Sequence, residues 1–303
     1  MSTAQLHVAC AVEGDEYLAH TAAMLHSALA SNHGATIHVH LLHGPDITGP
    51  QEEQLAEMVV RHGGEISYLR IADDEVAGLP TKGFTRKATW YRIFLPELLP
   101  EVDRLVYLDS DVLVLESLLP LARTDLRGNL VGAVTNVYRH DHLDRLAALG
   151  FDRPDRYFNA GVLLMDLDGM RRAGTSDALL NYGRENSAAL EWRDQDTLNA
   201  VLSDRRLPLH PRWNVMNSFE WPHAAEMFGA QAVDEARRHP AIRHFEGPDH
   251  YKPWHFMCEL EGHERYRDHR RQTPWPRYKP EGMTVWNVLR RGRRRLRGLG
   301  RHR

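Results

Sequence analysis

Cysteine is scarce in this chain of 303 residues, which contains only Cys10 and Cys258. A chain of this length can bury a substantial hydrophobic core, and two cysteines cannot form the dense disulfide framework of a small secreted domain. Long apolar runs are absent too, since no stretch approaches the roughly 18 apolar residues that a membrane-spanning helix requires. The first residues lack a cationic segment followed by an apolar run, so we expect no secretory signal. The sequence therefore indicates a globular protein.

Two glycine-rich motifs that bind phosphate are also missing. The chain has no G-x-x-x-x-G-K-[ST] sequence and no G-x-G-x-x-G sequence after its first expected strand. If the protein binds a diphosphate, another group must balance the negative charge. A divalent cation held by carboxylates would do so.

Lysine is rare, and positive charge is unevenly distributed. The chain has 38 Lys and Arg against 41 Asp and Glu, for a formal net charge of -3, and its lysines are Lys82, Lys87, Lys252 and Lys279. Residues 290–303 contain eight arginines and no acidic residue, which leaves 30 basic against 41 acidic residues, or -11, for the rest. The sequence thus describes an acidic body with a basic tail.

Apolar periodicity predicts strands that alternate with helices. Strands are expected over 6–12, 36–42, 66–71, 104–108, 112–115 and 158–166. Helices are expected over 18–31, 50–61, 85–95 (ended by Pro96), 175–187, 194–202 and, as a basic amphipathic helix, 284–299, whereas 203–257 is expected to be irregular. This alternation predicts an α/β fold, with a mostly parallel sheet, helices on both faces, and ligands beyond the carboxyl ends of the strands.

The segment Asp109-Ser110-Asp111 follows the apolar strand at 104–108 and precedes a second apolar run. Two carboxylates this close between apolar segments are costly unless a cation lies between them, so we expect a metal site. The string Asp109–Val112 also fits the D-x-D-x-[TV] motif of haloacid-dehalogenase-type phosphatases, in which the first Asp is the nucleophile. Against that hypothesis, the motif lies far from the start of the chain and no downstream G-D-x-x-x-D pair follows.

Several strings, in this order, resemble glycosyltransferase family 8, the retaining sugar-nucleotide transferases of GT-A fold. They are Ala11-Val12-Glu13 with Tyr17, Met24–Ser27, Ala88–Arg92, Val106–Val114, Tyr157–Val162, Asp194–Asn199, Trp213-Asn214, and His244–Gly247 with Lys252-Pro253-Trp254. The resemblance covers roughly residues 6–256. It implies a GT-A catalytic domain over 1–257 and a small irregular or helical C-terminal extension over 258–303 that carries the Arg-rich tail.

The resemblance also implies a metal site. Asp109 and Asp111 are two expected ligands and His244 the third. A mixed oxygen and imidazole set suits Mn²⁺ better than Ca²⁺, and Mg²⁺ is the alternative cofactor. Such an ion would bridge the diphosphate of a UDP-sugar and stabilise the leaving group.

Further residues are expected to bind the donor. Gly247 would let the backbone approach the diphosphate, and Lys252 would contact the same phosphates, although four residues separate them where the family usually has two. Tyr17 would pack against uracil, and Glu13 and Asp15 compete for the contact to the base. The remaining members of the expected donor site are Arg92, Ser110, Asn159, Ala160, Gly161, Asp194 and Gln195.

Arg92, Asp194 and Gln195 are the expected catalytic residues. Asp194 would bind hydroxyls of the donor sugar, and Gln195 would lie on the sugar face opposite the leaving group. Because an amide is a poor nucleophile, a covalent glycosyl-enzyme has little support. Front-face displacement is the alternative, and both routes retain configuration.

These observations predict a metal-dependent retaining transferase that moves glucose or galactose from UDP to an unidentified glycan, lipid-linked or other acceptor. The alternatives are the phosphatase that uses Asp109 and a non-catalytic nucleotide-sugar binding protein. We expect a cytoplasmic protein, and attachment of Trp286, Val288, Leu289 and the Arg-rich tail to anionic lipid would place it on the inner face of the membrane. One short basic run on an acidic body does not predict nucleic-acid binding.

Overall fold

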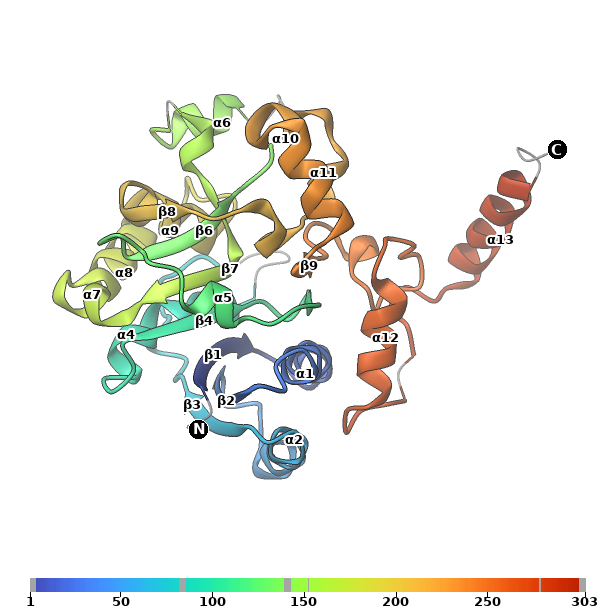
Figure 1. The fold of residues 1–303 in the computed structure, drawn as a ribbon, viewed down its shortest axis with the longest axis horizontal. Coiled ribbons are helices and arrows are strands. Elements are labelled where there is room, and N and C mark those ends of the chain that lie inside the picture. Colours follow the sequence, from blue (N-terminus) through green and yellow to red (C-terminus); the bar gives the residue numbers. More distant parts are fainter. Residues whose placement is uncertain (1–3, 82–85, 139–142, 152, 278, 300–303) are drawn as a thin grey trace.

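The protein is described by a computed structural model that covers residues 4–81, 86–138, 143–151, 153–277 and 279–299. Its centre is a seven-stranded sheet with the order β3-β2-β1-β4-β7-β6-β8 (Figure 1). The strands are β1 (Ala4–Val12), β2 (Ala35–His43), β3 (Glu65–Arg70), β4 (Arg104–Leu108), β6 (Val131–Thr135), β7 (Phe158–Asp166) and β8 (Arg206–Pro208). A separate two-stranded sheet pairs β5 (Val112–Val114) with β9 (Ile242–His244).

The large sheet is mostly parallel, as the sequence predicts. Strands β3, β2, β1 and β4 pair in parallel, and so do β6 and β8. Strand β7 runs antiparallel to both β4 and β6. The amino end of β7 therefore lies beside the carboxyl end of β4, since Leu108 pairs with Val162.

Helices cover both faces of this sheet. Helices α1 (Asp15–Ala30) and α2 (Gly49–Arg61) pack on one face, and α3 (Ala88–Tyr91), α7 (Leu167–Arg172), α8 (Thr175–Glu185) and α9 (Arg193–Leu202) pack on the other. Each face has its own hydrophobic core, and strand alternation assigns Val8 and Val39 to the first and Ala9 and Leu42 to the second. Cys10 and Cys258 are free, buried thiols.

The segment after Lys87 differs from the expected helix. The chain forms α3, a 3₁₀ turn (Arg92–Phe94) and α4 (Leu95–Leu98), and Pro96 lies in the first turn of α4 instead of ending a helix. Proline is tolerated in a first turn because the N–H that it lacks would have no partner there. Residue 85, where the helix was expected to begin, lies outside the described residues.

The segment 203–257 is more regular than expected. It contains α10 (Pro222–Phe228) and α11 (Ala230–Arg238), separated by Gly229 at φ 80°, as well as β8 and β9. Strand β6 was not anticipated either. All five of its residues are buried, so the alternation of exposed and buried positions that marks a strand in the sequence is absent.

Two helices follow the sheets at the C-terminal end. Helix α12 (His263–Arg271) packs against α1, and α13 (Val285–Leu299) projects from the body, which it contacts through Arg291 at Phe256 and Glu259 (Figure 1). Helix α13 agrees with the amphipathic helix expected over 284–299. A short α5 (Leu119–Ala122) and α6 (Leu143–Ala148) complete the α-helices of the described residues. Within these described ranges, we find no helix with the length and apolarity needed to cross a bilayer.

Candidate active site

Two strand pairings bring the three expected metal ligands together. Asp109 directly follows β4, and its backbone N–H donates to Gly161 O at 2.9 Å. The pairing of β5 with β9 places Val112 opposite His244. As a result, His244 Nε2 lies 3.3 Å from Asp111 Oδ1. Asp109, Asp111 and His244 each offer a ligand atom, and these atoms all lie within 4.8 Å of one another.

Gly161 permits this close approach. A Cβ atom at this position would lie 2.4 Å from His244 Cε1 and 3.0 Å from Asp109 Oδ2. Carbon atoms cannot approach so closely without a shift of the imidazole or the strand. Gly161 therefore makes room for the metal ligands on the neighbouring segments.

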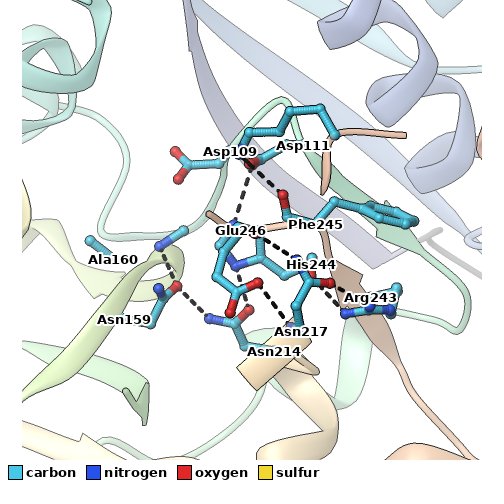
Figure 2. A network of polar contacts seen from close by, with 12 residues as sticks. Asp109, Asp111, Asn159, Ala160, Asn214, Asn217, Arg243, His244, Phe245 and Glu246 are labelled. Atoms are coloured by element: carbon cyan, nitrogen blue, oxygen red, sulfur yellow. Dashed lines mark hydrogen bonds and ion pairs between the residues drawn. The ribbon is translucent and has the colours of Figure 1, made fainter. Parts of the chain in front are cut away.

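A chain of amides orients the imidazole of His244 (Figure 2). His244 Nδ1 lies 2.9 Å from Asn214 Oδ1, and Asn214 Nδ2 donates to Asn159 Oδ1 at 2.8 Å. Because the Asn214 amide donates to Asn159, its oxygen is the atom that accepts from His244 Nδ1. The lone pair of His244 is then on Nε2, which faces Asp111.

Arg92 lies buried behind the carboxylates. Its guanidinium pairs with Asp109 Oδ1 at 2.9 Å and lies 3.5 Å from Asp194 Oδ2. It also donates to Ala160 O and lies over the ring of Tyr107, 4.2 Å from the ring centroid. Burial alone would lower the pKa of Arg92, but Asp109, Tyr107 and Asp194 raise it above its usual value. Arg92 is thus a permanent buried cation that holds two carboxylates.

Asp194 and Gln195 lie in the first turn of α9. Burial raises the pKa of Asp194 to about 6, although Arg92 acts in the opposite direction. Gln195 Oε1 accepts from the backbone N–H of Ala160 at 3.0 Å and from Asn159 Nδ2 at 3.2 Å. The amide oxygen of Gln195 is therefore already engaged by β7.

Lys252 reaches the same site despite the unusual spacing after Gly247. The intervening residues form a 3₁₀ turn, Asp249–Tyr251, which absorbs the extra length. The Lys252 ammonium donates to Asp111 Oδ2 and to Phe245 O, and Gly247 has a φ of 96°, which favours glycine. Burial would lower the pKa of Lys252, but Asp111 raises it overall.

The residues expected near the base fall into two groups. Tyr17 and Glu13 line a cleft beside the carboxylates, together with Arg86, whose guanidinium lies 4.0 Å from the centroid of the Tyr17 ring. Asp15 begins α1, accepts a hydrogen bond from Gln51 at the start of α2, and is not among the residues that line this cleft. Of the two competing acids, the structure brings Glu13 to the cleft.

Two adjoining clefts of about 480 and 660 Å³ meet at the carboxylates. Both are lined by Thr89, Arg92, Asp109, Asp111, Trp192, Gly247, Pro248 and Lys252. The first extends to Tyr17 and Ser110, whose hydroxyl lies 2.7 Å from that of Thr21. The second extends to Asn159, Ala160, Asp194, Gln195 and His244. The expected site residues other than Asp15 are therefore assembled around one continuous opening.

The structure adds lining residues to which the sequence analysis assigned no role. Arg86 lines the first cleft, Trp192 lines both, and Trp221 and Glu246 line the second. Asn214 is buried beneath them. Only Asn214 and Glu246 stood in strings that signalled the site, and no local pattern marked Arg86, Trp192 or Trp221.

The arrangement of charged and polar groups around the two clefts limits what they can bind. Acidic oxygen atoms and one imidazole nitrogen converge where a divalent cation would be held, and two cations, the buried Arg92 and the partly buried Lys252, lie beside them. Such a site can bind a polyanionic ligand in one cleft and a second, more weakly charged ligand in the other.

Known proteins are similar to this chain in sequence and in fold. Residues 8–258 match the family described as Glycosyl transferase family 8. General stress protein A of Bacillus subtilis (strain 168) is 28% identical over 277 residues, which are 88% of this chain and 93% of that protein. Lipopolysaccharide 1,2-glucosyltransferase of Escherichia coli (strain K12) is 24% identical over 229 residues, which are 74% of this chain and 65% of that protein.

A solved structure agrees with both matches. The galactosyltransferase LgtC, in complex with donor and acceptor sugar analogs, superposes with a TM-score of 0.80 at 27% identity. The superposition covers 91% of this chain and 98% of LgtC. The expected resemblance is confirmed, and so is the GT-A architecture. The chain belongs to glycosyltransferase family 8, and it is a glycosyltransferase.

Proposed function

We propose that this enzyme is a metal-dependent retaining transferase that moves a hexose, glucose or galactose, from a UDP-sugar to a glycan acceptor. The observation that carries the proposal is the convergence of Asp109, Asp111 and His244 between two cations, the buried Arg92 and the partly buried Lys252. The names of two relatives support it: one is a lipopolysaccharide glucosyltransferase, and the other is a galactosyltransferase solved with donor and acceptor sugar analogs.

The side chains of the site fit a divalent cation. Asp109, Asp111 and His244 would hold it, because two carboxylates and an imidazole suit Mn²⁺ better than Ca²⁺, with Mg²⁺ as the alternative ion. Gly161 leaves the space that the ligands need, and Asn214 turns His244 Nε2 toward them. When bound, the ion would neutralise the diphosphate and stabilise negative charge on the UDP leaving group.

The surrounding residues would bind the donor. Lys252 would supply a point charge to the diphosphate, and Gly247 would let the backbone approach it. Tyr17 would pack against the uracil ring and Glu13 would contact the base. Arg86 lies on the Tyr17 ring, so it is placed to add positive charge at the same end of the cleft.

The sugar would lie between β7 and α9. Asp194 would accept hydrogen bonds from hydroxyls of the sugar, and Asn159 would donate hydrogen bonds to them. Arg92 holds Asp194 in place. Gln195 would face the anomeric carbon. An amide oxygen that already accepts two hydrogen bonds is a weak nucleophile, which favours front-face displacement with the leaving phosphate taking the acceptor proton.

The two alternatives from the sequence are not favoured. A phosphatase that uses Asp109 as nucleophile would need that carboxylate free, whereas Arg92 holds it and the family match spans the domain. A non-catalytic binding protein would not need the complete set of metal ligands. Turnover with a UDP-sugar separates these hypotheses.

The decisive experiment measures UDP release from UDP-glucose and UDP-galactose with and without Mn²⁺. We expect Mn²⁺-dependent release by the wild type, loss of release in Asp111→Asn, and no change in Asp74→Asn, which alters an exposed aspartate. The anomeric configuration of the product, determined by NMR, tests retention. Equal activity without a divalent cation, or in Asp111→Asn, would contradict the proposal.

We further propose that residues 1–257 form the catalytic unit and that 258–303 form an extension which contacts anionic lipid from the cytoplasmic side. The family match ends at residue 258, and Trp286 on α13 is 79% exposed beside Val285, Leu289 and a run of arginines. Residues 300–303 of the tail lie outside the described residues. Deletion of 284–303 should release the protein from vesicles that contain anionic lipid and leave UDP release unchanged. Vesicle binding that survives the deletion would contradict this proposal.

A further inference from the structure

Three histidines gather on the second face of the large sheet, away from the donor clefts. His7 on β1 pairs in register with His38 on β2, and His40 lies two residues farther along β2 on the same face. On β3, Glu65 pairs with His38 and Ser67 pairs with His40, so both also lie on this face. We call His7, His38 and His40 the sheet-face histidine cluster.

The rings of this cluster are close and nearly parallel. The ring centroids of His38 and His40 are 4.3 Å apart, and those of His7 and His40 are 5.2 Å apart, with interplanar angles of 20° and 15°. Each ring offers a nitrogen atom, and the three atoms lie within 4.8 Å of one another. His40 is buried and the other two are half-buried, so the cluster is reachable from one side.

The distances between candidate ligand atoms in the cluster are near those between the ligand atoms of a metal site. In a tetrahedral Zn²⁺ site with bonds of about 2.0–2.1 Å, neighbouring ligand atoms are about 3.3 Å apart. His7 Nδ1 lies 2.9 Å from His40 Nε2, and His38 Nδ1 lies 3.5 Å from Glu65 Oε2. Small rotations of these side chains would bring the nitrogen atoms and the exposed carboxylate around one ion.

The hydrogen bonds of the cluster are also compatible with a bound ion. His38 Nε2 lies 2.7 Å from Ser67 Oγ, which can accept its proton and leave the lone pair on Nδ1, the atom that faces Glu65. His40 Nδ1 is buried, and among the described residues it has no hydrogen-bond partner. His40 Nε2, which faces His7, is the atom that would bind the ion, and a buried imidazole with one unpartnered nitrogen has no advantage over an apolar side chain in packing alone.

We propose that His7, His38 and His40 bind a transition-metal cation of the Zn²⁺ class, with the Glu65 carboxylate as a further ligand. Imidazole nitrogen is a preferred ligand of Zn²⁺, Cu²⁺ and Ni²⁺, whereas Mg²⁺ and Ca²⁺ prefer oxygen. The cluster therefore differs in metal preference from the set that contains Asp109 and Asp111. This inference does not depend on the proposed function.

The position of the proposed ion on the sheet indicates what it would do in the protein. The ion would join β1 to β2 and, through Glu65, to β3, which is the edge strand of the sheet. His7 is five residues before the end of β1 at Val12, or about 16 Å along the strand. The ion would thus lie too far from the donor clefts to contact the donor, and it would stabilise the fold.

Zinc titration of the untagged, full-length protein tests the proposal. Because the catalytic ligands can also bind Zn²⁺, the titration is done by calorimetry in the Asp111→Asn background. We expect one bound equivalent there, with a rise of several degrees in Tm. His38→Asn should abolish that equivalent or weaken it at least ~10-fold, and His33→Asn, which alters an exposed histidine just after α1, should not.

A second variant and a spectroscopic measurement distinguish the loss of a metal ligand from misfolding of the variant. His7→Gln changes a half-buried ligand and should have the same effect as His38→Asn in a protein whose circular dichroism is unchanged. Co²⁺ bound to the Asp111→Asn protein should show the visible d–d absorption of tetrahedral nitrogen ligation, and His38→Asn should lose it. Loss of the equivalent in either folded variant supports the site. No zinc binding in Asp111→Asn, or retention of the equivalent in both histidine variants, overturns it.

Discussion

Two clusters of side chains that could hold a metal ion lie in different parts of the molecule, one between β4 and the small sheet and the other on the large sheet, and they are built in different ways. In the donor site, each of two ligands has a polar partner of its own, since Arg92 holds Asp109 and Asn214 holds His244. The partners come from segments far apart in the chain. The geometry of the donor site therefore depends on residues that would never touch the ion.

In the sheet-face histidine cluster, the two polar partners named above, Ser67 and Glu65, both contact His38, and both come from the adjacent strand β3. The rings of the cluster contact mainly one another, and strand register alone places His7 beside His38. Such a cluster should tolerate changes around it but not changes of the rings themselves. The contrast teaches that the two proposed sites differ in the support that neighbouring residues give to the ligands, rather than in the number of ligands. The predictions below test this contrast, in order of decreasing effect.

The strongest test is Gly161→Ala. The added methyl group would lie 2.4 Å from His244 Cε1, so we expect UDP release to fall at least ~100-fold and the free energy of unfolding to fall by about 1–3 kcal/mol. Steady-state kinetics and urea unfolding measure both. Gly34→Ala is the matched control, because a Cβ atom added to Gly34 would have no neighbour within 4 Å. Wild-type activity in Gly161→Ala would show that the ligands need no such space.

Asn214→Ala removes the residue that orients His244 without removing a ligand. We expect the apparent affinity for Mn²⁺ to fall by roughly 10–100-fold, because the imidazole loses its fixed tautomer and orientation. Activity measured against Mn²⁺ concentration gives this value. Asn186→Ala, which removes a hydrogen bond to Tyr182 O at the end of α8, should leave it unchanged. An unchanged Mn²⁺ dependence in Asn214→Ala would remove the contrast between the two clusters.

Asp194→Asn should separate activity from stability. Because burial raises the pKa of Asp194 to about 6, its ionised form at neutral pH costs folding free energy, and a neutral amide should raise the free energy of unfolding by about 1–3 kcal/mol. Loss of a charged acceptor for the sugar should lower kcat/KM by ~10–100-fold. Urea unfolding of the metal-free protein and steady-state kinetics test this, with Asp204→Asn, which alters an exposed ion pair, as the control. A destabilised Asp194→Asn protein would contradict the prediction.

Buried imidazoles should make the fold sensitive to acid. The pKa values of His20 and His26 are lowered by burial to about 4, below the value near 6.5 expected in the unfolded chain. The unfolded state therefore binds more protons as the pH falls below 6.5, and stability is lost toward pH 4. We expect a loss of about 1 kcal/mol per ring between pH 7.5 and 5.5.

The groups that face these rings define the control. His20 faces Glu281, Arg270 and Arg86, and His26 faces His269 and His62. Urea midpoints between pH 7.5 and 5.5 should fall in the wild type, should fall less steeply in His26→Gln, and should follow the wild type in His33→Gln. Midpoints that stay constant or rise toward pH 5.5 would refute the prediction.

The sequence predicted those parts of the fold and the site that depend on local patterns. The strands before Asp109 are marked by short apolar runs, and the Asp109-Ser110-Asp111 segment stands directly after one of them. Strand β6 and helices α10 and α11 were missed, because β6 is buried on both faces and the helices are short segments set by Pro222 and Gly229. Tertiary packing, rather than periodicity, decides such elements.

Local sequence patterns could not predict how the site residues are oriented. The sequence left Glu13 and Asp15 as equal candidates, and only the start of α1 decides which of them lines the cleft. The spacing between Gly247 and Lys252 is irregular for the family, and a 3₁₀ turn absorbs it. Arg86 carries no sequence signal, because its contact with Tyr17 joins segments that are distant in the chain.

The pairing of β5 with β9 has a consequence for the order of synthesis. Asp109 and Asp111 emerge from the ribosome early, whereas His244 arrives only after α8 to α11 have been made. A nascent chain that stops before β9 carries two carboxylates without the imidazole, and it lacks Lys252 as well. With the ligands proposed above, such a chain would hold neither a metal nor the donor while most of it is still being translated, and transferase activity should begin only when β9 closes against β5.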